Sequence, residues 1–117
     1  MKILVLNFIM PFVILLVGSM FKKHPVSDMS SQNGYNTPAS RKSQARWDYA
    51  QEIAPDIFIS LGKTLGIIEA VCCFILLFFE VSPTNSVMIG NGIGVAFLIY
   101  GFYDIDSRIE KKFADDE

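Results

Sequence analysis

The sequence predicts an all-α integral membrane protein with three transmembrane helices and an amphipathic interfacial helix in the first loop. The chain has 117 residues, and 51% of them are hydrophobic. The apolar residues are concentrated in three long blocks, at 3–21, 57–79 and 87–103. A bilayer hydrocarbon core of about 30 Å requires ~17–25 helical residues, so each block is long enough to cross it.

These blocks divide the chain into six segments. They are a first transmembrane helix at 1–21, a loop with the interfacial helix at 22–56, a second transmembrane helix at 57–79, a short hairpin at 80–86, a third transmembrane helix at 87–103 and a charged tail at 104–117. The third block is the shortest and is rich in glycine, which is common in membrane helices.

The distribution of basic residues predicts the orientation. Only Lys2 precedes the first block, whereas Lys22 and Lys23 follow it, which is typical of a retained anchor rather than a cleaved signal peptide. The first loop and the tail carry most of the Lys and Arg residues, and the hairpin at 80–86 contains none. Lysine and arginine accumulate on the cytoplasmic side, so we expect the N-terminus outside and the C-terminus in the cytoplasm.

A helix is predicted in the second half of the first loop. Ser43 is a favourable N-cap, and apolar residues then recur at helical spacing. These residues are Trp47, Ala50, Ala54, Ile57 and Leu61. Another face is acidic and carries Asp48, Glu52 and Asp56. We expect this helix to lie at the membrane interface and to enter the second span with a bend at Pro55. The acidic face is either solvated or a cation site.

The same loop contains a motif that resembles the signature of the SdpI family. That signature has a glycine-tyrosine-x-threonine element, spaced serines, and a tryptophan followed three residues later by alanine. The matching residues are Gly34, Tyr35, Thr37, Ser40, Ser43, Trp47 and Ala50. Asn36 departs from the pattern, because a basic residue is usual at that position.

The resemblance implies a bacterial cytoplasmic membrane protein of the immunity or signalling type. The family's namesake gives immunity to a secreted peptide toxin. We therefore expect the chain to bind or sense a membrane-active peptide or a membrane-protein partner, within the lipid bilayer and with a homo-oligomer as an open alternative. The candidate binding residues are Gly34, Tyr35, Asn36, Thr37, Ser40, Ser43 and Trp47.

Four polar residues fall within the predicted spans, where polar groups are costly and often functional. Lys63 is expected to extend its side chain to the cytoplasmic surface. Asn7 and Asn91 lie at similar depth, and we expect a hydrogen bond between their helices. Glu69 lies near the middle of its span and should face other helices. It is either a structural hydrogen-bonding group or a proton or ligand site, and the latter supports an alternative role as a small subunit of a membrane transporter.

Several other function classes lack support. A net charge of −2 and the lack of a basic stripe argue against nucleic-acid binding. No nucleophile-elbow, phosphate-loop or zinc-protease motif occurs, so we expect no catalytic residues, metal or cofactor. Cys72 and Cys73 are adjacent on a predicted helix and point in different directions, so we interpret them as packing residues.

Overall fold

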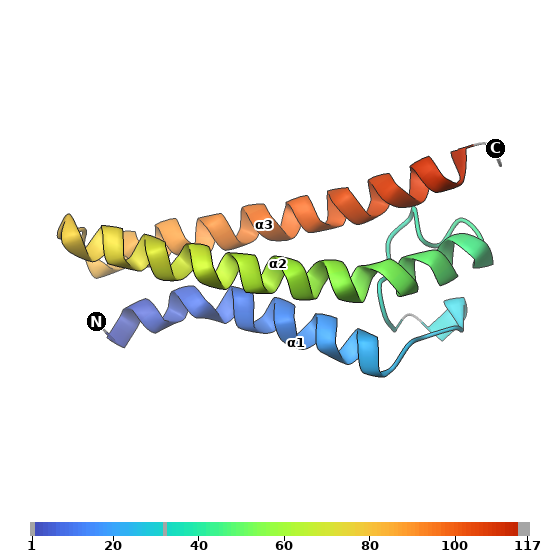
Figure 1. Cartoon of the computed structure of the whole chain (residues 1–117), viewed down its shortest axis with the longest axis horizontal. Helices are drawn as coiled ribbons and strands as arrows, with labels where there is room; N and C mark the ends of the chain where they lie inside the picture. Colours follow the sequence, from blue (N-terminus) through green and yellow to red (C-terminus); the bar gives the residue numbers. More distant parts are fainter. Residues whose placement is uncertain (1, 32, 115–117) are drawn as a thin grey trace.

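The computed structural model describes residues 2–31 and 33–114 and consists of three long helices. The elements are η1 (Lys2–Phe8, a 3₁₀ helix), α1 (Ile9–Lys23), η2 (Met29–Ser31), α2 (Gln44–Phe78) and α3 (Pro83–Lys112). Leu4–Lys23, α2 and α3 are each long and apolar enough to cross a membrane, so the predicted fold class is confirmed. In Figure 1, α2 runs through the middle, with α1 and α3 along its sides.

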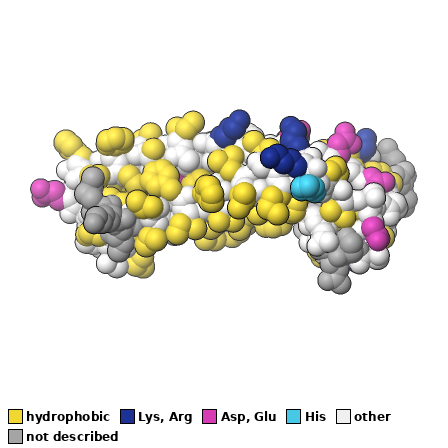
Figure 2. Space-filling view, turned by 90° about the horizontal axis from the view of Figure 1, so that it is seen from below, with side chains coloured by type: hydrophobic (Ala, Val, Ile, Leu, Met, Phe, Trp, Pro, Cys, Tyr) yellow, Lys and Arg dark blue, Asp and Glu magenta, His cyan; other side chains and the backbone are white. Residues whose placement is uncertain are grey.

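The two ends of the bundle differ in construction, and we name them by their connections. At the hairpin end, residues 79–82 join α2 to α3; at the loop end, residues 24–43 join α1 to α2. The N-terminus lies at the hairpin end and the C-terminus at the loop end (Figure 1). Figure 2 shows hydrophobic side chains along most of the length, with basic side chains gathered toward the loop end.

Helix α2 begins where the sequence predicts. The Ser43 side chain accepts a hydrogen bond from the Arg46 backbone N–H at 3.1 Å. The predicted amphipathic helix is present, but it is the first part of α2 rather than a separate element. The helix continues through Pro55 without interruption (Figure 1). Ala54 and Phe58 on either side of Pro55 are buried, and this packing holds the helix despite the one backbone hydrogen bond that proline removes.

Helix α3 is longer than predicted at both ends. It begins at Pro83 after the N-cap Ser82, whose hydroxyl accepts from the Asn85 N–H at 3.2 Å. The connection is therefore shorter than the predicted hairpin at 80–86. Helix α3 also continues to Lys112, so most of the predicted tail at 104–117 is helical rather than a separate segment. Ile105 and Ile109 are fully buried, and their packing extends the helix beyond the apolar block.

The outer surface of the bundle is apolar over the predicted spans. Large side chains such as Phe74, Phe78 and Met88 are 76%, 81% and 68% exposed. In water such a surface would favour aggregation, whereas in a bilayer it contacts lipid chains. The longest dimension of the molecule is 53 Å, which exceeds the roughly 30 Å of a hydrocarbon core. The charged loop end therefore extends beyond the lipid chains.

Glycines bring the helices together at the hairpin end. A methyl group on Gly90 would collide with the side chain of Asn7, and one on Gly94 would lie 2.9 Å from Cβ of Met10. On the other side of α1, a methyl on Gly62 would lie 3.1 Å from the Leu15 backbone nitrogen. These contacts are possible because glycine is the residue that permits such close approach of helices in a membrane.

Replacing Gly90 with alanine should destabilise the bundle. The added methyl displaces Asn7, and overpacking of this kind costs about 1–3 kcal/mol. Gly92→Ala is the matched control, since a methyl there meets nothing within 4 Å. Thermal unfolding in detergent micelles should show a lower midpoint for Gly90→Ala alone. Equal midpoints for the two variants would contradict the close contact between α3 and Asn7.

Candidate binding groove and signature loop

A groove with a volume of about 320 Å³ lies between α1 and α3. Phe58 of α2 contributes to its lining, and residues 34–36 of the first loop lie at its loop end. The remaining lining residues are Met10, Val13, Ile14, Val17, Phe21, Leu98 and Phe102. All of these side chains are uncharged, and several belong to surfaces that face lipid. The groove is therefore suited to an apolar occupant that approaches within the membrane.

Tyr35 packs its aromatic ring at the loop end of this groove. Its ring centroid lies 5.6 Å from that of Phe102 and 5.9 Å from that of Phe58, and the residue is only 2% exposed. The Tyr35 hydroxyl donates a hydrogen bond of 2.7 Å to Oδ1 of Asp106. Burial, together with this hydrogen bond, raises the pKa of Tyr35 above its ordinary value. The hydroxyl therefore remains a donor at neutral pH.

Two further contacts fix the loop around Tyr35. The Thr37 hydroxyl donates to the same oxygen of Asp106 at 2.9 Å. The Gln51 side-chain amide pairs with the Tyr35 backbone, accepting from its N–H at 2.9 Å and donating to its carbonyl at 2.6 Å. Gly34 precedes this pair with φ +80°, and a Cβ there would collide with the Gln51 side chain. Glycine meets both demands, because it has no Cβ and adopts positive φ readily.

The threonine-to-serine spacing of the motif forms a local turn. The Ser40 hydroxyl donates to the Thr37 carbonyl at 2.9 Å and accepts from the Thr37 N–H at 2.9 Å. The Thr37 hydroxyl also accepts from the Ser40 N–H at 3.2 Å. Ser40 is fully buried. Reciprocal bonds of this type are the way serine and threonine stabilise turns, so these two residues hold the loop in shape.

Trp47 lies beneath the loop rather than at a lipid interface. It is fully buried, and its indole N–H donates to the carbonyl of Val26 at 2.9 Å. The Arg41 guanidinium lies 5.9 Å from the centre of the indole ring. The sequence placed Trp47 on the apolar face of its helix, and that face is covered by the chain's own loop. Of the predicted binding residues, the structure brings Gly34, Tyr35 and Asn36 to the groove and places Thr37, Ser40, Ser43 and Trp47 in loop and helix-cap contacts.

Ion pairs join the helices at the loop end. Lys42 lies 3.0 Å from Glu110, and the buried Arg46 lies 3.6 Å from the same carboxylate. Arg46 also donates to the Phe113 carbonyl at 3.2 Å. The Lys42 hydrogen bond holds the pKa of Glu110 below its usual range. These contacts connect the start of α2 with the end of α3. The segment 34–46, which contains most of the motif, is therefore tied to α3 near both of its ends.

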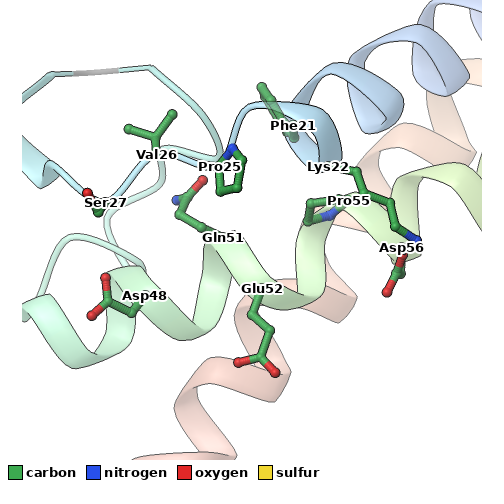
Figure 3. A pocket seen from close by; sticks show the side chains of 10 residues that line it. All are labelled: Phe21, Lys22, Pro25, Val26, Ser27, Asp48, Gln51, Glu52, Pro55 and Asp56. Carbon is green, nitrogen blue, oxygen red and sulfur yellow. Dashed lines mark hydrogen bonds and ion pairs between the residues drawn. The ribbon is translucent and has the colours of Figure 1, made fainter.

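The acidic face of α2 borders a surface pocket of about 410 Å³ (Figure 3). Figure 3 shows Asp48, Glu52 and Asp56 spread along the helix, without convergence on one point. Asp56 pairs with Lys22 at 2.8 Å, and Asp48 accepts from Gln44 at 2.8 Å. The arrangement favours a solvated, partly paired face, because a cation requires several oxygen ligands around one centre.

The polar residues within the spans have different environments. The predicted bond between α3 and the N-terminal helix is present: Asn91 Nδ2 donates to Oδ1 of Asn7 at 3.3 Å. Glu69 is fully buried and faces the other helices, as predicted. Lys63 is exposed and borders a shallow apolar groove between α1 and α2. Its position on the surface permits the predicted extension toward the charged end of the bundle.

Sequence reasoning did not identify two residues that hold the loop. Gln51 and Asp106 supply the contacts that position Tyr35, and neither belongs to the motif. A signal existed for Gln51, which follows Trp47 by one helical turn and is polar among buried neighbours. Asp106 lies far from Tyr35 in sequence, and no local pattern relates the two residues.

The fold and site define a small helical membrane protein with three helices able to span a bilayer. Residues 28–103, which include the signature loop (residues 34–43), all of α2 and most of α3, match the model of the SdpI/YfhL protein family. The chain belongs to this family, as the resemblance of its motif indicated. Comparison with curated proteins and with solved structures gave no match.

Replacing Asp106 with alanine should release the loop. The hydroxyls of Tyr35 and Thr37 then lose their acceptor, which costs about 1–3 kcal/mol for buried donors. Because Trp47 is the only tryptophan and lies under the loop, its emission should shift to longer wavelength as the loop detaches.

Asp104→Ala is the matched control for this change. Asp104 hydrogen-bonds Arg108, one helical turn away, at 3.3 Å, and an exposed pair of this kind contributes little. An unchanged Trp47 emission in Asp106→Ala would show that the carboxylate does not hold the loop.

Proposed function

We propose that this SdpI-family protein binds an apolar segment of a membrane-inserted peptide or partner protein in the groove between α1 and α3. The observation that carries the proposal is the uncharged groove with Tyr35 at its loop end. The groove offers aliphatic and aromatic side chains over its length, and exposed Asn36 supplies polar groups at one end. In the cell, such binding would serve an immunity or signalling role.

Tyr35 supports a sensing role for the signature loop. Its ring borders the groove, while its hydroxyl contacts Asp106 on α3. An occupant that displaces the ring therefore weakens the hydrogen bonds that hold residues 34–37 in place. The same loop packs over Trp47 and leads into α2 through Ser43. Occupancy of the groove is thereby coupled to the polar surface at the loop end, where a second protein has access.

Filling the groove should weaken peptide binding. The probe is a synthetic apolar helical peptide of about 20 residues, long enough to span, with a fluorescence acceptor for Trp47. In lipid vesicles, Val13→Phe with Val17→Phe should weaken peptide binding about tenfold, because two phenyl rings occupy the space. Energy transfer from Trp47 to the peptide measures the affinity.

The control places the same two changes on a lipid-facing surface. Ile67 and Val71 have the same spacing on α2 and are 67% and 53% exposed. Ile67→Phe with Val71→Phe should leave energy transfer unchanged. The groove is not the binding site if both double variants bind the peptide as the unmodified protein does. The sensing role fails if an excess of the same peptide without the acceptor leaves Trp47 emission unaltered.

We also propose that the protein lies in the bacterial cytoplasmic membrane with its loop end in the cytoplasm. Basic residues support this orientation, because they are concentrated at the loop end and accumulate on the cytoplasmic side of membranes. The loop-end residues are Lys22, Lys23, Arg41, Lys42, Arg46, Arg108, Lys111 and Lys112. The groove is then closed by Tyr35 on the cytoplasmic side.

Cysteine accessibility on intact cells tests this orientation. Single cysteines at Thr84 and Lys112, in a background without Cys72 and Cys73, are exposed to a membrane-impermeant thiol reagent. Position 84 should react and position 112 should not, since the two lie at opposite ends of α3. Reaction at position 112 alone would reverse the orientation and place the signature loop outside the cell.

A further inference from the structure

Glu69 is an exception among the buried polar side chains that the structure describes. It is fully buried, and neither of its carboxylate oxygens has a hydrogen-bond partner among the described residues. Each of the other buried polar side chains has at least one partner: Asn7, Ser40, Arg46 and Ser86. A buried carboxylate without a partner is costly inside a membrane, so its presence calls for a ligand or a chemical role.

Polar side chains lie between the hairpin end and the part of α2 that carries Glu69. Cys73 follows one turn later on the same face of α2, and Asn7 Nδ2 lies 3.7 Å from its sulfur. Asn7 also donates to the Ser86 carbonyl at 3.2 Å and accepts from Asn91. Next to Ser86, Asn85 is exposed at the hairpin end. We name Asn7, Asn85, Ser86 and Asn91 the polar column, because they lead from the surface to Cys73, which lies one helical turn from Glu69.

The opposite direction is closed by apolar side chains. Leu65, one turn before Glu69 on the same face, is fully buried. Phe58 and Ile105 continue the same core cluster toward the loop end, at 4% and 0% exposure. A polar species crosses such a packed apolar core at high cost, whereas side-chain amides and hydroxyls offer it hydrogen bonds. Access to Glu69 is therefore easier from the hairpin end.

The chemistry of the site favours a proton over a metal ion. A metal ion requires several oxygen, nitrogen or sulfur ligands arranged around it. Glu69 is a single carboxylate, and no group of three His, Cys, Asp or Glu side chains gathers within the described residues. The titratable groups nearest in α2 are Cys72 and Cys73, while the polar column contributes only uncharged amides and a hydroxyl. A proton binds one carboxylate and needs neither additional ligands nor a cavity.

We propose that Glu69 is a proton-binding site that exchanges with the hairpin side of the membrane through the polar column. A proton on Glu69 neutralises the carboxylate within the bundle, so proton occupancy is coupled to close packing of the three helices. This site is separate from the groove between α1 and α3. It is also the element that a transport role would require.

Modification by dicyclohexylcarbodiimide, in vesicles that hold the whole chain, tests the site. This reagent partitions into lipid and adds to a protonated carboxyl. The acid proton passes to a carbodiimide nitrogen, the carboxyl oxygen bonds to the central carbon, and the adduct rearranges to a stable N-acylurea. Mass spectrometry of the peptide that contains Glu69 measures the yield, and Glu69→Gln shows that the adduct is specific.

The pH is changed on one side of the vesicles at a time, with a cysteine at Thr84 reporting their orientation. The yield should fall several-fold when the hairpin side is made alkaline and should not respond to brief changes on the loop side. Asn7→Leu, which interrupts the polar column, should slow this response several-fold. Thr64→Val also removes a polar group, but at an exposed position outside the column, and it should leave the response unchanged.

Three results would overturn the proposal. They are the absence of an adduct at Glu69, a yield that is independent of pH on both sides, and a yield that follows the loop side. An equal response in Asn7→Leu and Thr64→Val would remove the polar column as the route. None of these results depends on peptide binding in the groove, so the two proposals fail separately.

Discussion

The carboxylate of Asp106 holds the signature loop against α3, and the shape of the loop end depends on it. One of its oxygens accepts from both Tyr35 and Thr37, at 2.7 and 2.9 Å. Hydrogen bonds to a carboxylate are stronger than those between neutral groups, and partial burial protects them from competition by water. With Gln51 fixing the Tyr35 backbone, the loop becomes a structural part of the bundle rather than a solvated connection.

The two ends of the bundle are held by different means, and the groove is the consequence. At the hairpin end, Gly90 and Gly94 let α3 approach the N-terminal helix closely. Toward the loop end α1 and α3 separate from each other, and the loop lies between them (Figure 1). Tyr35 occupies this space and packs against Phe102 and Phe58. An apolar groove therefore remains between close glycine contacts at one end and an aromatic residue at the other.

The three long apolar blocks of the sequence predicted most of the fold, because apolar blocks of this length have few alternatives to membrane helices. Cap chemistry at Ser43 and matching depth for Asn7 and Asn91 were also local enough to predict, and both contacts are present. The roles of the motif residues were not predictable in the same way. Trp47 lies on the apolar face of an amphipathic helix, but the loop that buries it is held in place by Asp106, and no local pattern indicates that contact.

Hydrogen exchange of the ligand-free protein in lipid tests most directly whether the signature loop is a fixed part of the bundle. The Tyr35 N–H, which donates to Gln51, and the Thr37 N–H, which donates to Ser40, are the amides to follow. If the loop is fixed by Asp106, both should exchange much more slowly than the Ser30 N–H, which donates to Asp28 within an exposed turn. Exchange of all three at one fast rate would show that the loop is not part of the folded bundle, and Tyr35 would then not close the groove.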